Sequence, residues 1–89
     1  MNNKIDTLFN ETIHELSNKS KLNSEDPTYE YILKQLEFVY DCLKSEKDIF
    51  NELQGRELDF PAVASKNLGG SEDELLEKIG DISIYLSNI

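Results

Sequence analysis

The sequence has little positive charge and a single arginine, Arg56. Nine lysine and arginine residues stand against 18 aspartate and glutamate residues, which gives a formal net charge of −9 at pH 7. Proteins that bind DNA or RNA draw much of their affinity from basic side chains that neutralise phosphates, and anionic membrane surfaces attract the same side chains. The charge balance therefore argues against a nucleic-acid or membrane partner and favours a basic protein partner.

Long apolar runs are also missing, and Cys42 is the single cysteine. A helix that spans a bilayer needs about 20 consecutive apolar residues, and the sequence has no such run. The N-terminal stretch MNNKIDTLFNETIHEL contains acidic residues and no small-residue cleavage site, so we do not expect a signal peptide. A lone cysteine cannot form an internal disulfide, which agrees with a reducing compartment. We therefore expect a cytoplasmic protein.

The short chain limits what can be built from it. Residues 1–89 leave room for one core, so we expect a single helical domain. A domain of this size buries about 60 to 65% of the surface that its unfolded chain exposes, which disfavours an enzyme with a deep substrate cavity.

Apolar spacing predicts a helix over about 4–17, with Asn3 as its cap. Pro27 follows Asp26, an arrangement typical of a helix start, and predicts a second helix over 27–44. Continued to residue 54, that helix would be about 42 Å long, more than a domain of this size accommodates. Ser45 with Asp48 resembles a capping box, so we expect a break near Ser45 and a further helix over 46–54.

The C-terminal third predicts two more helices. The stretch DFPAVASKNLGG favours a helix over 61–67, with Asp59 or Phe60 as its cap and Gly69 after its end. Ser71 and Glu74 can form a capping box for a helix over 72–87. The fold class is therefore all-α, a compact bundle of four to five helices at about 4–17, 27–44, 46–54, 61–67 and 72–87.

Residues 81–89 leave one alternative open. The stretch DISIYLSNI alternates apolar and polar residues, as a strand does, but no second strand is evident to pair with it. A helix is therefore preferred, and its outer side carries Asp73, Glu77 and Ile84 with Gly80 at the edge. An interior glycine is unfavourable, so Gly80 either allows close approach of another helix or marks the end of this one.

The stretch 27–43 is more apolar than one core-facing stripe requires. Tyr31, Phe38, Cys42 and Ile49 form a second apolar strip, either packed against another helix, which we prefer, or exposed for a partner. Opposite the core runs an acidic row of Glu30, Glu37, Asp41, Asp48 and Glu52. The core face holds Tyr29, Ile32, Leu33, Leu36, Val39, Tyr40 and Leu43, and also Phe50 if the helix continues.

The sequence offers no catalytic constellation. His14 lies opposite the apolar stripe of its helix, and Asp41 beside Cys42 raises the pKa of the thiol and makes it a poor nucleophile. The carboxylates do not have calcium-loop spacing, and the acidic turn after LGGS would repel a nucleotide phosphate. We therefore expect no enzyme activity, no cofactor and no metal.

In length, acidity and helical content the whole chain resembles the small helical immunity proteins that bacteria pair with colicins and contact-dependent inhibition toxins. The adjacent tyrosines with which nuclease-colicin immunity proteins bind are missing here. The resemblance implies an inhibitor that occludes a basic, nuclease-like toxin, as a monomer or homodimer. The partner-binding residues that we predict are Glu30, Tyr31, Glu37, Phe38, Asp41, Asp48 and Glu52.

Two other classes of function remain open. A helical adaptor, chaperone or regulatory subunit, or a self-associating bundle, would dock through the apolar strip. A carboxylate-based enzyme or metal-binding protein is the least supported, because no helix adds a histidine to a set of carboxylates.

Overall fold

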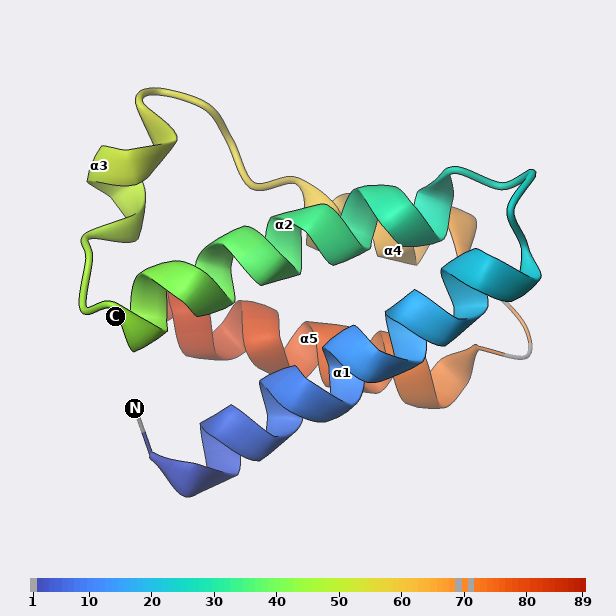
Figure 1. Ribbon diagram of the computed structural model, residues 1–89, viewed down its shortest axis with the longest axis horizontal. Coiled ribbons are helices and arrows are strands. Elements are labelled where there is room, and N and C mark those ends of the chain that lie inside the picture. Colours follow the sequence, from blue (N-terminus) through green and yellow to red (C-terminus); the bar gives the residue numbers. More distant parts are fainter. Residues whose placement is uncertain (1, 69, 71) are drawn as a thin grey trace.

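Five helices follow one another in the computed structural model, which describes residues 2–68, 70 and 72–89 (Figure 1). No strand occurs among these residues, so the prediction of an all-α fold is confirmed and the alternative of a C-terminal strand is wrong. The helices are α1 (Asn3–Leu22), α2 (Thr28–Lys44), α3 (Ile49–Leu53), α4 (Phe60–Asn67) and α5 (Asp73–Ser87).

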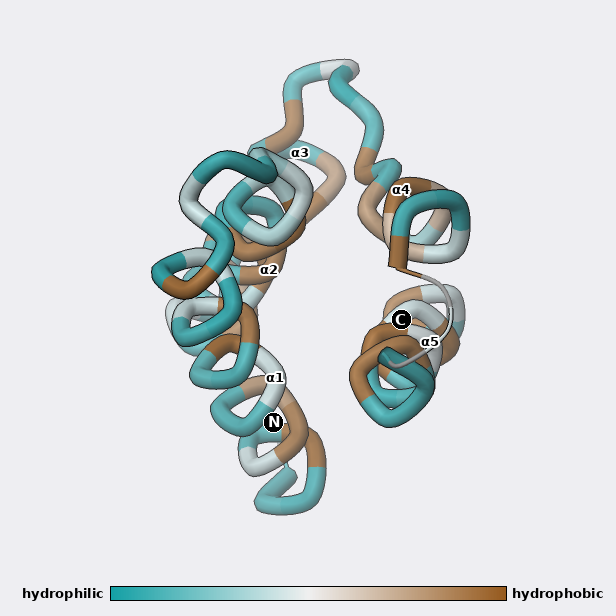
Figure 2. Tube along the Cα trace, turned by 90° about the vertical axis from the view of Figure 1, so that its right-hand side faces the viewer, coloured by the Kyte–Doolittle hydropathy of each residue, from teal (hydrophilic) through white to brown (hydrophobic). Residues whose placement is uncertain are grey.

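Four of the helices form a closed ring in two layers. Helices α1 and α2 make one layer, and α4 and α5 make the other, with the apolar sides of the helices turned inward (Figure 2). Helix α2 contacts both α1 and α4, and α5 closes the ring by contacting α4 and α1. The short α3 makes its helix–helix contact with α2. Helix α2 therefore contacts three other helices, which explains why its sequence is more apolar than one core-facing stripe requires.

The first helix is longer than the sequence predicted. The polar stretch after residue 17 contains no glycine or proline, and α1 continues through it to Leu22. Lys19 lies in the last turn, where a cation interacts favourably with the helix dipole, and its Nζ lies 2.7 Å from Oε1 of Glu72 at the start of α5. At the other end, Asn2 rather than Asn3 is the cap, because its Oδ1 accepts a hydrogen bond from the N–H of Ile5 at 2.9 Å.

The predicted break at Ser45 is confirmed, but the capping box is not. Helix α2 ends at Lys44, and α3 begins at Ile49 instead of residue 46. Its cap is Asp48, whose Oδ1 accepts hydrogen bonds from the N–H groups of Phe50 at 3.0 Å and Asn51 at 3.4 Å. Ile49 is buried, in agreement with the preferred internal packing of its strip, and Phe50, placed on the core face only for a continuous helix, is 65% exposed.

The start of α4 is held by a side chain from α2. Asp59 occupies the predicted cap position but makes no capping hydrogen bond of its own. Instead, Oε1 of Gln35 accepts a hydrogen bond from the N–H of Phe60 at 2.9 Å, and Nε2 of Gln35 donates to Asp59 at 2.7 Å. The hydroxyl of Tyr31 donates to the same carboxylate at 2.8 Å. These bonds fix the first turn of α4 against the side of α2.

The predicted start of α5 lies partly outside the described residues. Ser71, the proposed cap, and Gly69, the proposed end signal of α4, are not among them. Helix α5 begins at Asp73, one residue later than expected, with Glu72 at the cap position. It then runs through Gly80 to Ser87.

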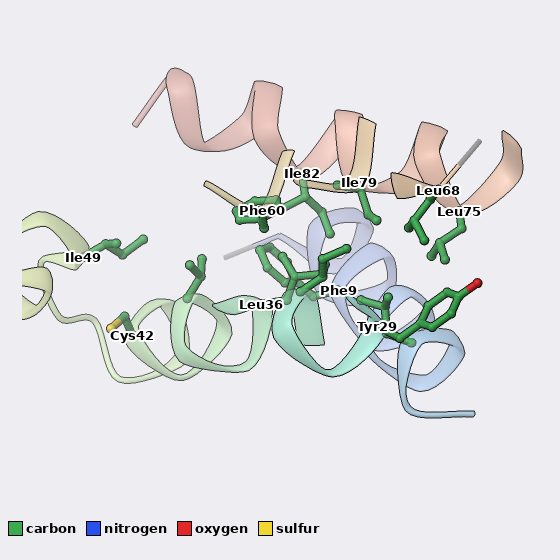
Figure 3. Packing of buried hydrophobic residues seen from close by; sticks show 14 of the residues in the cluster. Phe9, Tyr29, Leu36, Cys42, Ile49, Phe60, Leu68, Leu75, Ile79 and Ile82 are labelled. Atoms are coloured by element: carbon green, nitrogen blue, oxygen red, sulfur yellow. The ribbon is translucent and has the colours of Figure 1, made fainter. Parts of the chain in front are cut away.

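The core lies between the two layers and takes residues from every helix (Figure 3). Tyr40 of α2 stacks on Phe9 of α1 with ring centroids 5.3 Å apart, and its hydroxyl donates to Asp6. Thr12 is buried, and its hydroxyl donates to the carbonyl of Leu8 at 2.7 Å. The core-face prediction for α2 is largely confirmed. The apolar residues with at most 1% of their surface exposed are Phe9, Leu16, Ile32, Leu36, Val39, Phe60, Ala64, Leu75, Ile79 and Ile82.

The cost of an interior glycine in α5 can be tested at Gly80. A Cβ at this position would meet no heavy atom within 4 Å, so the residue neither enables a close helix contact nor ends α5. Gly80→Ala is therefore expected to raise the free energy of unfolding by about 1 kcal/mol, and the melting temperature by about 4 to 8 °C, measured by circular dichroism.

Gly55→Ala is the matched control for this prediction. Gly55 also has open space around it, but its φ of +86° lies in the left-handed region that alanine adopts at a cost. The control should lower the melting temperature. A Gly80→Ala protein that melts below the wild type would contradict the open environment described for α5.

Gln35 provides a second test. Gln35→Met keeps the length of the side chain but leaves the N–H of Phe60 without its partner, so we expect a loss of about 1 to 2 kcal/mol in urea denaturation. Tyr31→Phe should cost less, because it removes one donor to Asp59 and leaves the α4 cap intact.

The stability lost in Gln35→Met should also depend on pH. Hydrogen bonds from Gln35 and then Tyr31 lower the pKa of the Asp59 carboxyl below its ordinary value. The contribution of Asp59 is therefore complete above an unfolded pKa of about 4 and is lost as the pH falls through the folded-state pKa. The stability difference between Gln35→Met and the wild type should shrink over that range, and a difference that grows on acidification would contradict these bonds.

Candidate functional site

Helix α2 presents an acidic row to solvent on the side opposite the core. Glu30, Glu37 and Asp41 are all exposed there, one or two turns apart. The Nζ of Lys34 lies 3.7 Å from Glu30, and the Nζ of Lys44 lies 3.9 Å from Asp41. Among the described residues, Glu37 has no ion pair. The row is therefore acidic, but two of its carboxylates have a lysine close by.

The other two predicted acidic residues do not continue this row. The chain turns between Lys44 and Ile49, so Asp48 and Glu52 leave the line of α2. Asp48 caps α3, and the half-buried Glu52 lies close enough to Cys42 to add to the effect of burial in raising the pKa of the thiol. The thiol is thus protonated at neutral pH, which makes it a poor nucleophile.

The second apolar strip of α2 is mostly covered. Cys42 and Ile49 are buried, and Phe38 is partly buried against the core. Tyr31 is 46% exposed, with its ring at the surface and its hydroxyl bound to Asp59. The strip therefore serves internal packing, the interpretation that the sequence favoured, and Tyr31 is its exposed end.

Tyr31 and Phe38 line one pocket. It has a volume of about 340 Å³ and lies between α2 and the segment that connects α3 to α4. Lys34 and Gln35 complete the α2 wall, and the opposite wall consists of Leu53, Arg56, Glu57 and Leu58. Lys34 lines the pocket and its Nζ lies 3.7 Å from Glu30, so the pocket borders the acidic row.

Sequence analysis did not assign a role to Arg56. Its Nε donates a hydrogen bond to the carbonyl of Leu53 at 3.0 Å, and its guanidinium carbon lies 5.9 Å from the centre of the Phe38 ring. These contacts hold the side chain against the pocket wall. The signal in the sequence was its isolation as the single arginine of an acidic chain.

A second acidic surface lies on the outer side of α5, in the other layer. Asp73, Glu74, Glu77 and Asp81 are all exposed there. The one lysine of α5 turns inward, because the Nζ of Lys78 lies 3.2 Å from Glu15 and 3.9 Å from Glu11 of α1. The expected exposure of Ile84 is confirmed at 63%. This face is at least as acidic as that of α2, a comparison that the sequence could not make.

The described residues offer little for catalysis or metal binding. No three of their histidine, cysteine and carboxylate side chains are placed to hold a metal ion. His14 is exposed, and its Nε2 lies 3.3 Å from Nδ2 of Asn18. No helix in this part of the chain is both long enough and apolar enough to cross a bilayer.

Comparison with known proteins gives one match. The model of a protein family described as Tsi6 matches residues 4–88, almost the whole chain. No curated protein and no solved structure matches it. The match supports the toxin-immunity type that length, acidity and helical content suggested, without pointing to the colicin or contact-dependent inhibition groups. The chain belongs to the Tsi6 family, a family of type VI secretion immunity proteins.

Proposed function

We propose that this chain is a non-catalytic inhibitor that neutralises a basic toxin domain by covering it with the outer face of α2. The observation that carries the proposal is the exposed row of Glu30, Glu37 and Asp41 on a chain of net charge −9. Membership of an immunity-protein family supports a toxin as the partner.

Charge complementarity explains why such a surface suits a nuclease-like toxin. An enzyme that binds phosphate-containing substrates is basic at its active site, so a row of carboxylates is attracted to that region. Opposite fields also speed association, which matters for an inhibitor that must act before the toxin does. We place the encounter in the cytoplasm, because a chain with one cysteine forms no internal disulfide and suits a reducing compartment.

The aromatic residues beside the row supply a candidate anchor. Tyrosine and arginine are enriched among the residues that contribute most to binding energy. Tyr31 is half exposed and oriented by its bond to Asp59, so it is already held in one position before binding. Phe38 is less accessible and forms the floor of the pocket next to it.

Docking through the apolar strip, as an adaptor or a self-associating bundle, has less support. Cys42 and Ile49 are buried and Phe38 is partly buried, so the strip offers no continuous apolar surface. Light scattering over a range of protein concentrations tests the remaining possibility of self-association through another surface.

The proposal predicts the effect of reversing charge on α2. A toxin domain co-purified with the tagged wild-type protein provides the binding partner. Glu37→Lys combined with Asp41→Lys should weaken binding of that domain by at least about tenfold at low salt, because both repulsion and slower association result. Titration calorimetry measures the affinity, and growth of cells that express the toxin measures protection.

Glu77→Lys combined with Asp81→Lys is the matched control. It changes net charge by the same amount, with the same spacing of four residues, on the exposed face of α5 in the opposite layer. The control should reduce the association rate slightly and leave protection intact. If only the α5 variant loses binding and protection, the inhibitory face lies on α5, and the assignment to α2 is wrong. If neither variant loses affinity, the proposal that charge complementarity drives toxin binding is wrong.

A further inference from the structure

The pocket beside the acidic row contains an arginine that is positioned but not neutralised. The Nε of Arg56 is fixed by the carbonyl of Leu53, and the guanidinium lies over Phe38. Among the described residues, no carboxylate forms an ion pair with Arg56, although half of the lysines do form such pairs. Arg56 therefore keeps its charge available to a ligand, although Glu57 lines the same pocket.

The geometry of Arg56 suits one class of ligand. With Nε occupied, the two terminal nitrogens remain as a planar pair of donors, which matches the two oxygens of a carboxylate. Contact with an aromatic ring and a backbone bond reduces the entropy that the side chain would lose on binding. Lys34, whose Nζ lies 3.7 Å from Glu30, lines the facing wall, and Glu57 is the one acidic side chain that lines the pocket.

We infer that this pocket receives a carboxylate side chain, aspartate or glutamate, from the toxin domain, and that Arg56 binds it through both terminal nitrogens. The inference rests on the proposed function, since it assigns the pocket to the same partner that covers the acidic row. The role of the contact between Arg56 and this carboxylate is to position the two proteins. A row of carboxylates can slide along a basic surface with little change in energy, whereas one contact of opposite sign fixes the register of the two proteins.

Substitution of Arg56 distinguishes this contact from general electrostatic attraction, because the two predict opposite changes in affinity for the toxin. Arg56→Glu makes the protein more acidic, so attraction to a basic toxin should increase if no local contact exists. A carboxylate in the pocket predicts the reverse: binding weakens roughly 10- to 100-fold, mainly through faster dissociation. Lys21→Glu, which makes the same charge change at an exposed position of α1, is the control and should bind as tightly as the wild type or tighter.

The experiment uses the co-purified toxin domain and the full chain, with kinetics measured by surface plasmon resonance. Arg56→Lys keeps the charge but loses the planar pair of donors, and should bind several-fold less tightly than the wild type. Each surface aspartate and glutamate of the toxin is then changed to arginine. One such change should restore binding to Arg56→Glu while weakening binding to the wild type. Thermal melting of each variant confirms that the fold is kept, and Arg56→Gln replaces Arg56→Glu if that variant melts early.

The outcomes separate this inference from the proposed function. If Arg56→Glu binds as tightly as the wild type or tighter, and the Glu37→Lys, Asp41→Lys variant is weakened, the acidic row stands and the carboxylate contact is overturned. The contact is also overturned if no toxin substitution restores binding. If Glu37→Lys, Asp41→Lys retains full affinity, the proposed function of the α2 row fails independently of Arg56.

Discussion

The arrangement of the outer side of α2 depends on the hydrogen bonds of Gln35. This side chain binds both the first backbone N–H of α4 and the Asp59 carboxylate, so one residue in the middle of α2 sets where the next layer begins. Because α4 starts there, the connection from α3 must return along α2. That path places Arg56 opposite Tyr31 and creates the pocket between them. Packing of the fold and formation of the candidate site are therefore consequences of the same contact.

Sequence patterns were most informative where helix packing alone decides the structure. The core face predicted for α2 contains the buried residues Tyr29, Ile32, Leu36 and Val39, and the length of a continuous helix to residue 54 predicted the turn at Ser45. The errors occurred where a helix end depends on a single local hydrogen bond or on a distant partner. Asp48, instead of Ser45, caps α3, so the helix begins three residues later than predicted. Likewise, no local pattern indicates that residue 35 caps a helix that begins at residue 60.

The candidate site shows a similar limit. The total charge follows from composition alone, but the location of unpaired charge depends on which lysines lie beside carboxylates. Lys34 and Lys44 lie beside carboxylates of the α2 row, whereas Lys78 turns toward α1 and leaves the outer face of α5 without a cation of its own. The pairs of Lys34 and Lys44 are local, four and three residues apart within α2, whereas the pair of Lys78 with Glu15 joins helices that are far apart in the sequence. The acidic row of Glu30, Glu37 and Asp41 could therefore be predicted from the sequence, whereas the inward pairing of Lys78 that leaves the α5 face without a cation could not.

The attachment of α3 has a consequence for hydrogen exchange. Helices α1, α2, α4 and α5 close a ring through their mutual contacts, whereas α3 joins the bundle through its helix contact with α2. Local opening of α3 exposes chiefly Ile49 and Leu53 and leaves the ring of four helices closed. The free energy of this opening should therefore be lower than the free energy of global unfolding. We therefore expect the chain to unfold in two cooperative units. The amides of α3 exchange through a local opening, and those in the middle of α2 exchange only when the whole bundle unfolds.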